Sequence, residues 1–255
     1  MNRILCRLLP LTLLTACAGA MADTPAPQFD RPGIAFATAT VPRGSLSFEQ
    51  GLPDFQHSSD AGVKATTYAA DTNVRIGLTD SLELQVGGAL FNYMTVHSQG
   101  TEAISHGMGD SNLALKISLP SASPRITWAM LGGVTFATGD RDFTAGAPEY
   151  DLGTTVSVQL ADNESTAFYV NVSRFHDATT YTVSPSFSYS LTDTVGTFFE
   201  AGASHASHEP DIDVAGGGVT WMVTPVVQLD LSADFGLNHA SPDIHGGFGF
   251  SVFVD

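Results

Sequence analysis

The chain contains little cysteine and little basic charge, and each shortage excludes a class of protein. The 255 residues include 2 cysteines, Cys6 and Cys17, both near the start of the chain. We expect both to leave with a secretory signal, so no thiol remains for a disulfide or a thiolate metal site in an oxidising compartment. The 10 lysine and arginine residues face 26 aspartate and glutamate residues, a formal net charge of −16. So acidic a chain repels nucleic acid, and we exclude nucleic acid as a partner.

The first 22 residues are typical of a signal peptide. Arg3 and Arg7 come before or beside an apolar run over residues 8–16 that is too short to span a bilayer. Ala20-Met21-Ala22 is a small-x-small cleavage site. Cleavage before Cys17, as in a lipoprotein, is the alternative. We favour the ordinary signal, because a closed barrel holds itself in a membrane without an acyl anchor.

Charged residues and long apolar runs are also scarce. Only 14% of the residues are charged although 43% are hydrophobic, whereas a soluble domain carries about 25% charged residues. Beyond the signal no run of about 20 apolar residues occurs, so the sequence predicts no transmembrane helix. A β-barrel reconciles these features, because its lipid-facing residues occupy only alternate positions of short strands.

Apolar residues recur with period two from residue 44 onward, as in Leu82, Leu84 and Val86. We predict an all-β fold, a transmembrane antiparallel up-and-down β-barrel of about 12 strands over residues 44–255. It follows the signal peptide (1–22) and an N-terminal periplasmic segment (23–43). A soluble β-sandwich shows the same alternation, but the signal and the even number of hairpins favour the barrel. The predicted strands are 44–52, 66–78, 82–91, 109–119, 126–137, 150–160, 166–174, 180–191, 195–204, 213–223, 227–237 and 244–253.

Short and long connections alternate between these strands, which is typical of periplasmic turns and extracellular loops. Pairing around one short turn would place Phe187 opposite Phe199 on the lipid face. The shortest turns are 79–81, 192–194 and 224–226, and the notable long loops are 53–65, 92–108 and 138–149.

Short motifs spread over nearly the whole mature chain resemble one family of outer-membrane barrels. In chain order they are Arg31-Pro32-Gly33, Val41-Pro42-Arg43-Gly44, Phe48-Glu49-Gln50-Gly51, Val74-Arg75-Ile76-Gly77-Leu78-Thr79 with Leu82-Glu83-Leu84, Gly109-Asp110-Ser111-Asn112-Leu113 with Lys116, Ala137-Thr138-Gly139-Asp140, Phe199-Glu200, Gln228-Leu229-Asp230 and Gly247-Phe248-Gly249-Phe250. Each motif is short, but their order is specific. The chain resembles the family named for the MetA pathway of phenol degradation, whose members are often called transporters. The resemblance implies a bacterial outer-membrane channel connected with the breakdown of aromatic compounds.

The chain departs from this resemblance at its end. Barrels of this kind commonly finish on an aromatic residue that the barrel assembly machinery recognises, whereas this chain finishes Phe253-Val254-Asp255. We expect Phe253 to substitute for the terminal aromatic residue.

Polar side chains at inward positions are the predicted lining of the lumen, because basic residues that face lipid at mid-depth cost about 2–4 kcal/mol. Arg75 should lie opposite Gln85 and diagonal to Glu83, within reach of an ion pair. The set forms either a polar constriction that selects solutes or a network that fills a narrow barrel. Its members are Glu49, Arg75, Glu83, Gln85, Asn112, Lys116, Asn171, Glu200, Gln228, Asp230 and Asp234.

We expect an outer-membrane channel or uptake barrel that passes small solutes, aromatic or hydrophobic ones included, by passive diffusion. Its expected partners are outer-membrane lipid, the barrel assembly machinery and the solute. The acidic excess predicts a preference for cations or neutral solutes. The alternative is a structural or surface-interaction barrel with a closed lumen. A barrel-embedded enzyme is less favoured, because neither a Gly-x-Ser-x-Gly nor a His-Glu-x-x-His motif occurs.

All eight histidines fall at the end of the barrel that is predicted to face outward. Imidazole is a common ligand of transition metals. The stretch from His205 to His208 and Glu209, with His239 of the next loop, therefore suggests a zinc or copper site at the extracellular mouth. The alternative is that polar loops collect histidines without function. We expect no other cofactor.

Overall fold

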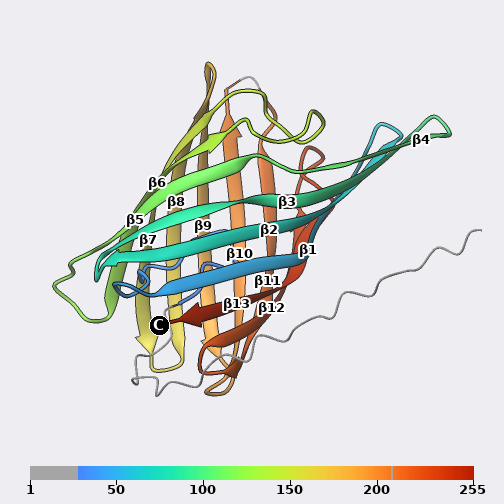
Figure 1. The fold of residues 1–255 in the computed structure, drawn as a ribbon. Coiled ribbons are helices and arrows are strands. Elements are labelled where there is room, and N and C mark those ends of the chain that lie inside the picture. The colour runs from blue at the N-terminus through green and yellow to red at the C-terminus, as the bar shows by residue number, and fades with distance from the viewer. Residues whose placement is uncertain (1–27, 208) are drawn as a thin grey trace, which may run out of the picture.

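The computed structural model describes residues 28–207 and 209–255, and their regular secondary structure is entirely β-strand. The strands form one antiparallel sheet that closes on itself as a barrel (Figure 1). Among the described residues, no helix is long and apolar enough to cross a membrane. The strands are β1 (Leu46–Asp60), β2 (Val63–Thr79), β3 (Leu82–Ser98), β4 (Thr101–Gly107), β5 (Ser111–Leu119), β6 (Ile126–Phe136), β7 (Glu149–Ala161), β8 (Glu164–Phe175), β9 (Ala178–Ser190), β10 (Val195–Ala206), β11 (Ile212–Thr224), β12 (Val227–Gly236) and β13 (Ile244–Val254).

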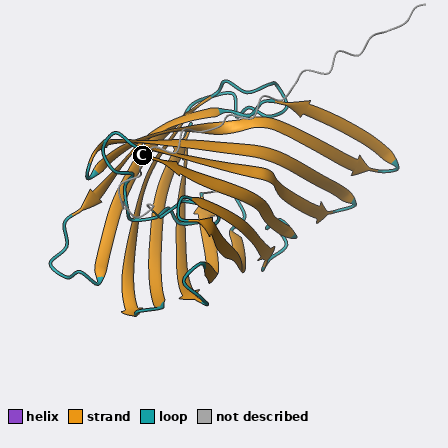
Figure 2. Cartoon of the chain, turned by 60° about the horizontal axis from the view of Figure 1, so that its bottom comes forward, coloured by secondary structure: helices purple, strands orange, loops and turns teal. Residues whose placement is uncertain are grey.

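Thirteen strand segments make twelve barrel strands, because β4 and β5 share one position. Residues 82–88 of β3 pair with β5, and residues 92–98 of β3 pair with β4. The first and last strands, β1 and β13, also pair and close the sheet, which Figure 2 shows as one curved layer. The predicted barrel of about 12 strands is confirmed.

Two of the predicted long loops are strand instead. The hairpins β1–β2 and β3–β4 extend through residues 53–65 and 92–108 and turn at two-residue tips. Ala61-Gly62 and Gln99-Gly100 at these tips have positive φ throughout, as tight hairpin turns require. Figure 1 shows the β3–β4 hairpin projecting beyond the rest of the barrel. The third predicted loop, 138–149, contains no strand before Glu149.

The outer face of the barrel is apolar. Phe187 on β9 lies opposite Phe199 on β10, as predicted, and both rings are exposed. Other exposed apolar residues include Leu113, Leu115 and Leu231. The neighbouring residues along these strands face the lumen, so the alternation in the sequence separates a lipid-facing surface from a polar interior.

The segment before β1 does not lie in the periplasm as predicted. Residues 28–45, which we call the lumen segment, run inside the barrel and bond to inward side chains. The segment joins β1 over Gly77, where an added Cβ would stand 1.8 Å from the carbonyl oxygen of Pro42. Its buried partners include the carboxylates of Glu49 and Glu83 and the guanidinium of Arg75, so the backbone groups of the segment and the charged groups of the lumen satisfy one another.

Candidate functional site in the barrel lumen

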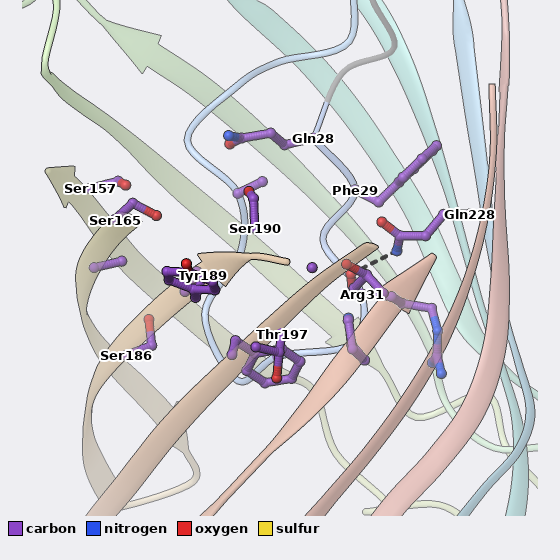
Figure 3. Close-up of a pocket in the computed structure, with 18 of the residues that line it drawn as sticks. Gln28, Phe29, Arg31, Ser157, Ser165, Ser186, Tyr189, Ser190, Thr197 and Gln228 are labelled. Carbon is purple, nitrogen blue, oxygen red and sulfur yellow. Dashed lines mark hydrogen bonds between the residues drawn. The ribbon is translucent and has the colours of Figure 1, made fainter. Parts of the chain in front are cut away.

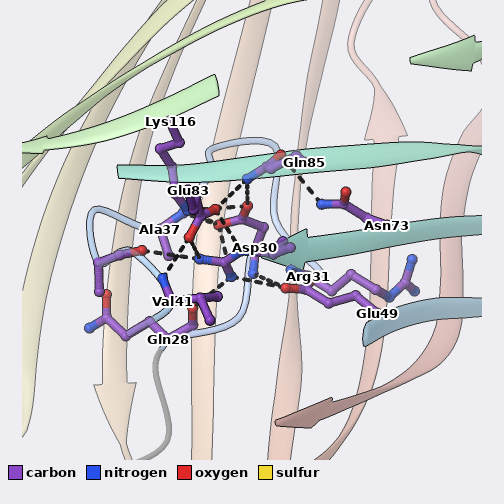
Figure 4. A network of polar contacts seen from close by, with 12 residues as sticks. Gln28, Asp30, Arg31, Ala37, Val41, Glu49, Asn73, Glu83, Gln85 and Lys116 are labelled. Atoms are coloured by element: carbon purple, nitrogen blue, oxygen red, sulfur yellow. Dashed lines mark hydrogen bonds and ion pairs between the residues drawn. The ribbon is translucent and has the colours of Figure 1, made fainter. Parts of the chain in front are cut away.

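One side of the lumen is a charged wall, made by β1, β2, β3 and β5. At its centre Arg75 is fully buried and holds Glu83 with two hydrogen bonds, Nε to Oε1 at 2.8 Å and Nη2 to Oε2 at 3.0 Å. Its Nη1 donates to Glu49 Oε1 at 2.9 Å. The ion pair predicted for Arg75 and Glu83 is confirmed, and Figure 4 shows the network around these groups.

The lumen segment completes this network with its backbone. Arg75 donates to the carbonyl oxygens of Gln28 and Ala39, at 2.9 and 3.1 Å. In return the backbone N–H of Val41 donates to Glu83 Oε2 at 2.6 Å. The guanidinium of Arg75 and the carboxylate of Glu83 thus both form hydrogen bonds with the backbone of the segment. These bonds compensate charges that would otherwise be costly to bury.

Asp30 carries a carboxylate from the lumen segment into the same wall. Lys116 Nζ donates to Asp30 Oδ1 at 2.9 Å, and Gln85 Nε2 donates to Asp30 Oδ2 at 2.8 Å. The backbone N–H of Ala37 also donates to Asp30 Oδ1 at 2.9 Å, and that of Asp30 donates to Glu49 at 3.1 Å. Asp30 therefore both fastens the segment and closes the loop that follows it.

Arg31 makes a second anchor on the side of β1 and β12. Its Nη1 and Nη2 donate to Asp54 at 2.8 and 2.9 Å, and Nη2 also reaches Asp230 Oδ1 at 3.1 Å. The guanidinium lies over Gly249, where an added Cβ would come within 2.5 Å of it. A planar fork held by a bidentate carboxylate is a strong and directional contact.

The opposite side is a hydroxyl wall on β7 to β10. Its inward positions carry Thr155, Ser157, Ser165, Ser184, Ser186 and Ser188. Thr155 and Ser184 are almost fully buried, yet neither hydroxyl has a hydrogen-bond partner in the described chain. Apart from the carboxylates of Asp151 on β7 and Glu200 on β10, this wall offers uncharged donors and acceptors, and few of its hydroxyls bond to other groups.

The lumen segment touches the hydroxyl wall at few points. The backbone N–H of Ile34 donates to Glu200 Oε2 on β10 at 2.9 Å, and Phe36 meets Tyr169 edge to face with ring centroids 5.6 Å apart. The segment is thus fastened to the charged wall and only rests against the other.

Two cavities lie in the lumen on either side of the segment. The larger, the lower cavity, has a volume of about 1010 Å³ and runs from the segment to the short turns around residues 162–163 and 193–194 (Figure 3). The smaller, the upper cavity, has a volume of about 360 Å³ and is lined by Asp71, Asn112 and Asp151 among others. Of the described residues that line these two cavities, only Arg31 lines both. The lumen segment therefore separates them.

A comparison of the sequence with known protein families identifies the family of this chain. The model of the family described as "Putative MetA-pathway of phenol degradation" matches residues 29–253. The chain belongs to this family. The match begins within the lumen segment, so the segment is part of the shared pattern as well as the strands.

Solved structures show the same fold at low sequence identity. The COG4313 outer membrane channel from Pseudomonas putida F1 is 12% identical, with a TM-score of 0.69 over 88% of this chain and 98% of that one. The NanC porin is 9% identical, with a TM-score of 0.51 over 82% of this chain and 99% of that one. No curated protein matches the sequence.

The predicted lumen residues of this family member fall into three groups. Four of them are buried in the charged wall, and one of these, Glu49, also lines the upper cavity. Others line a cavity. Asn112 and Gln85 line the upper cavity, and Gln85 also belongs to the charged network. Glu200 and Gln228 line the lower cavity. Asn171 lies on the inner face beside Gly153, Asp230 binds Arg31, and Asp234 is buried with no partner for its Oδ1 in the described chain. The four in the charged wall are Glu49, Arg75, Glu83 and Lys116.

Sequence reasoning missed Asp30, Arg31 and Asp54. Arg31 was visible in a motif of the family resemblance, but the segment that carries it was predicted to lie in the periplasm. Asp54 lies in a predicted loop, after a bulge that shifts β1 against its neighbours. The available signal was Arg31 itself. It is one of the few basic residues of an acidic chain, and it precedes the first strand.

The predicted metal site stays a prediction. His205 Nδ1 lies 2.6 Å from Asp211 Oδ1, whereas the described residues Glu209 and His239 are exposed and make no hydrogen bond or ion pair with His205. In the described ranges no group of three or more metal-binding side chains could hold an ion. His208 lies outside these ranges, as does the predicted signal peptide.

Asp110 links the two walls at the loop end of the barrel. It lies between β4 and β5, and its carboxylate accepts the backbone N–H groups of Gly139 and Ala145, both at 2.8 Å, from the β6–β7 loop. Slight burial works against the charged form, but these hydrogen bonds outweigh it and hold the pKa of Asp110 below its usual value of 3.8. The ionised carboxylate therefore holds the loop in place.

Proposed function

We propose that this protein is a passive channel of the bacterial outer membrane for small solutes. The observation that carries this proposal is the lower cavity of about 1010 Å³ inside a closed barrel with an apolar outer face. The solved structures with a similar fold include an outer membrane channel and a porin. A wall of uncommitted hydroxyls suits uncharged polar solutes, and Phe36 and Phe198 in the same cavity suit aromatic ones.

Conductance in planar bilayers tests this proposal. Purified, folded protein should give discrete channel events, because the lumen contains a cavity on each side of the lumen segment. Folding is checked first by the heat-dependent shift of the barrel on a gel. Folded protein that never conducts and does not admit neutral solutes into liposomes would contradict the channel.

The selectivity should favour cations over anions. Glu200, Asp230 and Asp234 are each at least nine-tenths buried, and each has a carboxylate oxygen without a partner in the described residues. Both terminal nitrogens of Arg31, which lies beside Asp230, already bond to Asp54 and Asp230. The reversal potential in a salt gradient measures this preference, and an anion-selective reversal would contradict it.

The second candidate is a structural or surface-interaction barrel with a closed lumen. The lumen segment favours it, because the segment lies between the two cavities and is bonded to both sides of the lumen. We infer no enzymatic activity. Growth of a deletion strain on a panel of aromatic and fatty substrates would identify the solute class, and the partners we propose remain outer-membrane lipid, the assembly machinery and that solute.

A further inference from the structure

The loop from Pro32 to Ala37 is held at its ends and loose in its middle. At one end Arg31 is clamped by Asp54 and Asp230. At the other end Thr38 Oγ1 lies 2.7 Å from Thr127 Oγ1, and the Thr38 carbonyl accepts a hydrogen bond from Ser118. Between these anchors all six residues are only half-buried. Such a loop can move without loss of the anchors on either side.

The base of this loop is closed independently of the hydroxyl wall. The backbone N–H of Ala37 donates to Asp30 Oδ1, seven residues earlier, and Lys116 binds the same oxygen. The loop therefore keeps its two ends together when its tip moves. It is a compact unit mounted on the charged wall.

The tip contacts the far wall through one hydrogen bond and two apolar contacts. Glu200 Oε2 accepts the backbone N–H of Ile34 at 2.9 Å, while its Oε1 has no partner in the described chain. The Ile34 side chain lies against Gly202, where an added Cβ would stand 2.9 Å from its Cδ1. Phe36 packs on the edge of Tyr169. Only Glu200 supplies a directional bond there.

The loop also forms the boundary of the lower cavity. Pro32, Gly33, Ala35 and Phe36 line that cavity, as Glu200 does from the wall. Figure 3 shows Arg31 of the lumen segment together with Thr197 and Ser186 around this cavity. The contact between Ile34 and β10 therefore lies at the boundary of the lower cavity.

We propose that Pro32–Ala37 is a flap, that Glu200 is the residue that latches it to β10, and that solutes pass between the flap and the hydroxyl wall when the latch releases. This inference rests on the proposed channel function. Glu200 acts as a positioning residue: it sets where the flap lies. The anchors at Arg31 and Thr38 stay in place during the movement.

Cross-linking tests the route. Ile34→Cys with Gly202→Cys ties the flap to β10, and Thr38→Cys with Thr127→Cys is the matched control that ties a part already anchored. Oxidation of the flap pair should lower single-channel conductance at least tenfold, with recovery after reduction, whereas the control pair should change it less than twofold. Disulfide formation is verified by mass, and oxidised wild type controls for the oxidant. Unchanged conductance in the verified flap cross-link would overturn the route and leave the channel function standing.

The latch is tested by paired substitutions and a second readout that needs no conduction. Glu200→Gln keeps an acceptor for the Ile34 N–H and should keep the open probability of the wild type, although it removes one of the carboxylates that favour cations. Glu200→Ala should raise the open probability several-fold. A cysteine placed alone at Ile34 should react with a water-soluble thiol reagent at least tenfold faster in the Glu200→Ala background than with Glu200 present. Equal rates would overturn the latch. If no variant conducts while the reactivity rises as expected, the proposed channel function fails and the movable flap stands without a transported solute.

Discussion

The two walls of the lumen differ in how their polar groups are satisfied. On the charged wall Arg75 and Glu83 are fully buried and bond to each other and to the backbone of the lumen segment. On the hydroxyl wall Thr155 and Ser184 are as deeply buried, but their hydroxyls have no partner in the described chain. One wall fixes the segment, and the other leaves a cavity beside it.

The difference follows from the cost of burying each kind of group. An unpaired charge in the interior is so costly that it must find partners, whereas an unpaired hydroxyl costs far less. The charged wall therefore binds the segment inside the lumen, whereas the hydroxyl wall can remain next to an open cavity. A barrel of twelve strands can in this way be filled on one side and open on the other.

Removal of Arg75 should break the charged wall with the largest effect. Arg75→Met leaves Glu49, Glu83 and Asp30 buried without their shared cation, and a buried ion pair that loses one partner costs about 3–5 kcal/mol. The free energy of unfolding in urea, measured in detergent micelles, checks this loss.

An exposed arginine supplies the control for this experiment. Arg174 lies 3.6 Å from Asp177, and both side chains are more than half exposed, so Arg174→Met should cost only about 0–1 kcal/mol. Equal losses in the two variants would show that burial in the network adds nothing.

Replacement of Arg31 should release the segment without unfolding the barrel. Arg31→Gln removes the fork that binds Asp54 and Asp230, and hydrogen bonds to charged partners contribute about 1.5–3 kcal/mol. A loss of about 2 kcal/mol raises the undocked population about 30-fold. Hydrogen exchange at the backbone amides of Asp30 and Arg31, which donate to Glu49, measures that population.

The conservative variant sharpens the result. Arg31→Lys keeps the charge but not the planar fork, so it should fall between wild type and Arg31→Gln. Exchange that is as slow in Arg31→Gln as in wild type would mean that the contacts of Asp30 and Arg75 suffice to hold the segment.

Much of the barrel follows from the sequence, because lipid selects apolar residues at every second position. That pattern predicts the strand number, the pairing of Phe187 with Phe199 and the ion pair of Arg75 with Glu83. It does not predict the ends of β1 and β3, whose hairpins project beyond the lipid-facing band where both faces can be polar. The tip turns Ala61-Gly62 and Gln99-Gly100 lie in segments that the sequence predicts as loops.

The lumen segment could not be placed from the sequence by the same logic. It has no periodic pattern, and its position depends on partners far away in the chain, such as Asp230 for Arg31 and Lys116 for Asp30. Local spacing carries no information about such pairs. The small number of basic residues limits the possible partners of the inward carboxylates. Two of these basic residues, Arg75 and Lys116, bond to the segment.

The loop end offers a smaller test of how the walls are joined. Because the pKa of Asp110 is lowered in the folded protein, its ionised form stabilises the β6–β7 loop above pH about 3.8, and this contribution is lost as the pH falls through the lower folded value. At neutral pH Asp110→Asn should speed hydrogen exchange at Gly139 and Ala145 about tenfold, the equivalent of one charged hydrogen bond. Asp142→Asn is the control, because within the described part of the chain Asp142 accepts a hydrogen bond only from the Ser105 side chain. Equal effects of the two variants would refute the role of Asp110.

The smallest effect should come from the hydroxyl wall, where a hydroxyl without a partner can be compared with a bonded hydroxyl of the lumen segment. Thr155→Val replaces a buried hydroxyl that has no partner in the described residues with a methyl group of similar size, so the free energy of unfolding should change by less than about 0.5 kcal/mol. Thr38→Val makes the same replacement where the hydroxyl bonds to Thr127 at 2.7 Å, and it should cost about 1 kcal/mol. Urea unfolding of the two variants side by side measures the difference. If Thr155→Val costs as much as Thr38→Val, the Thr155 hydroxyl has a partner in solution, and the hydroxyl wall is as fully satisfied as the charged one.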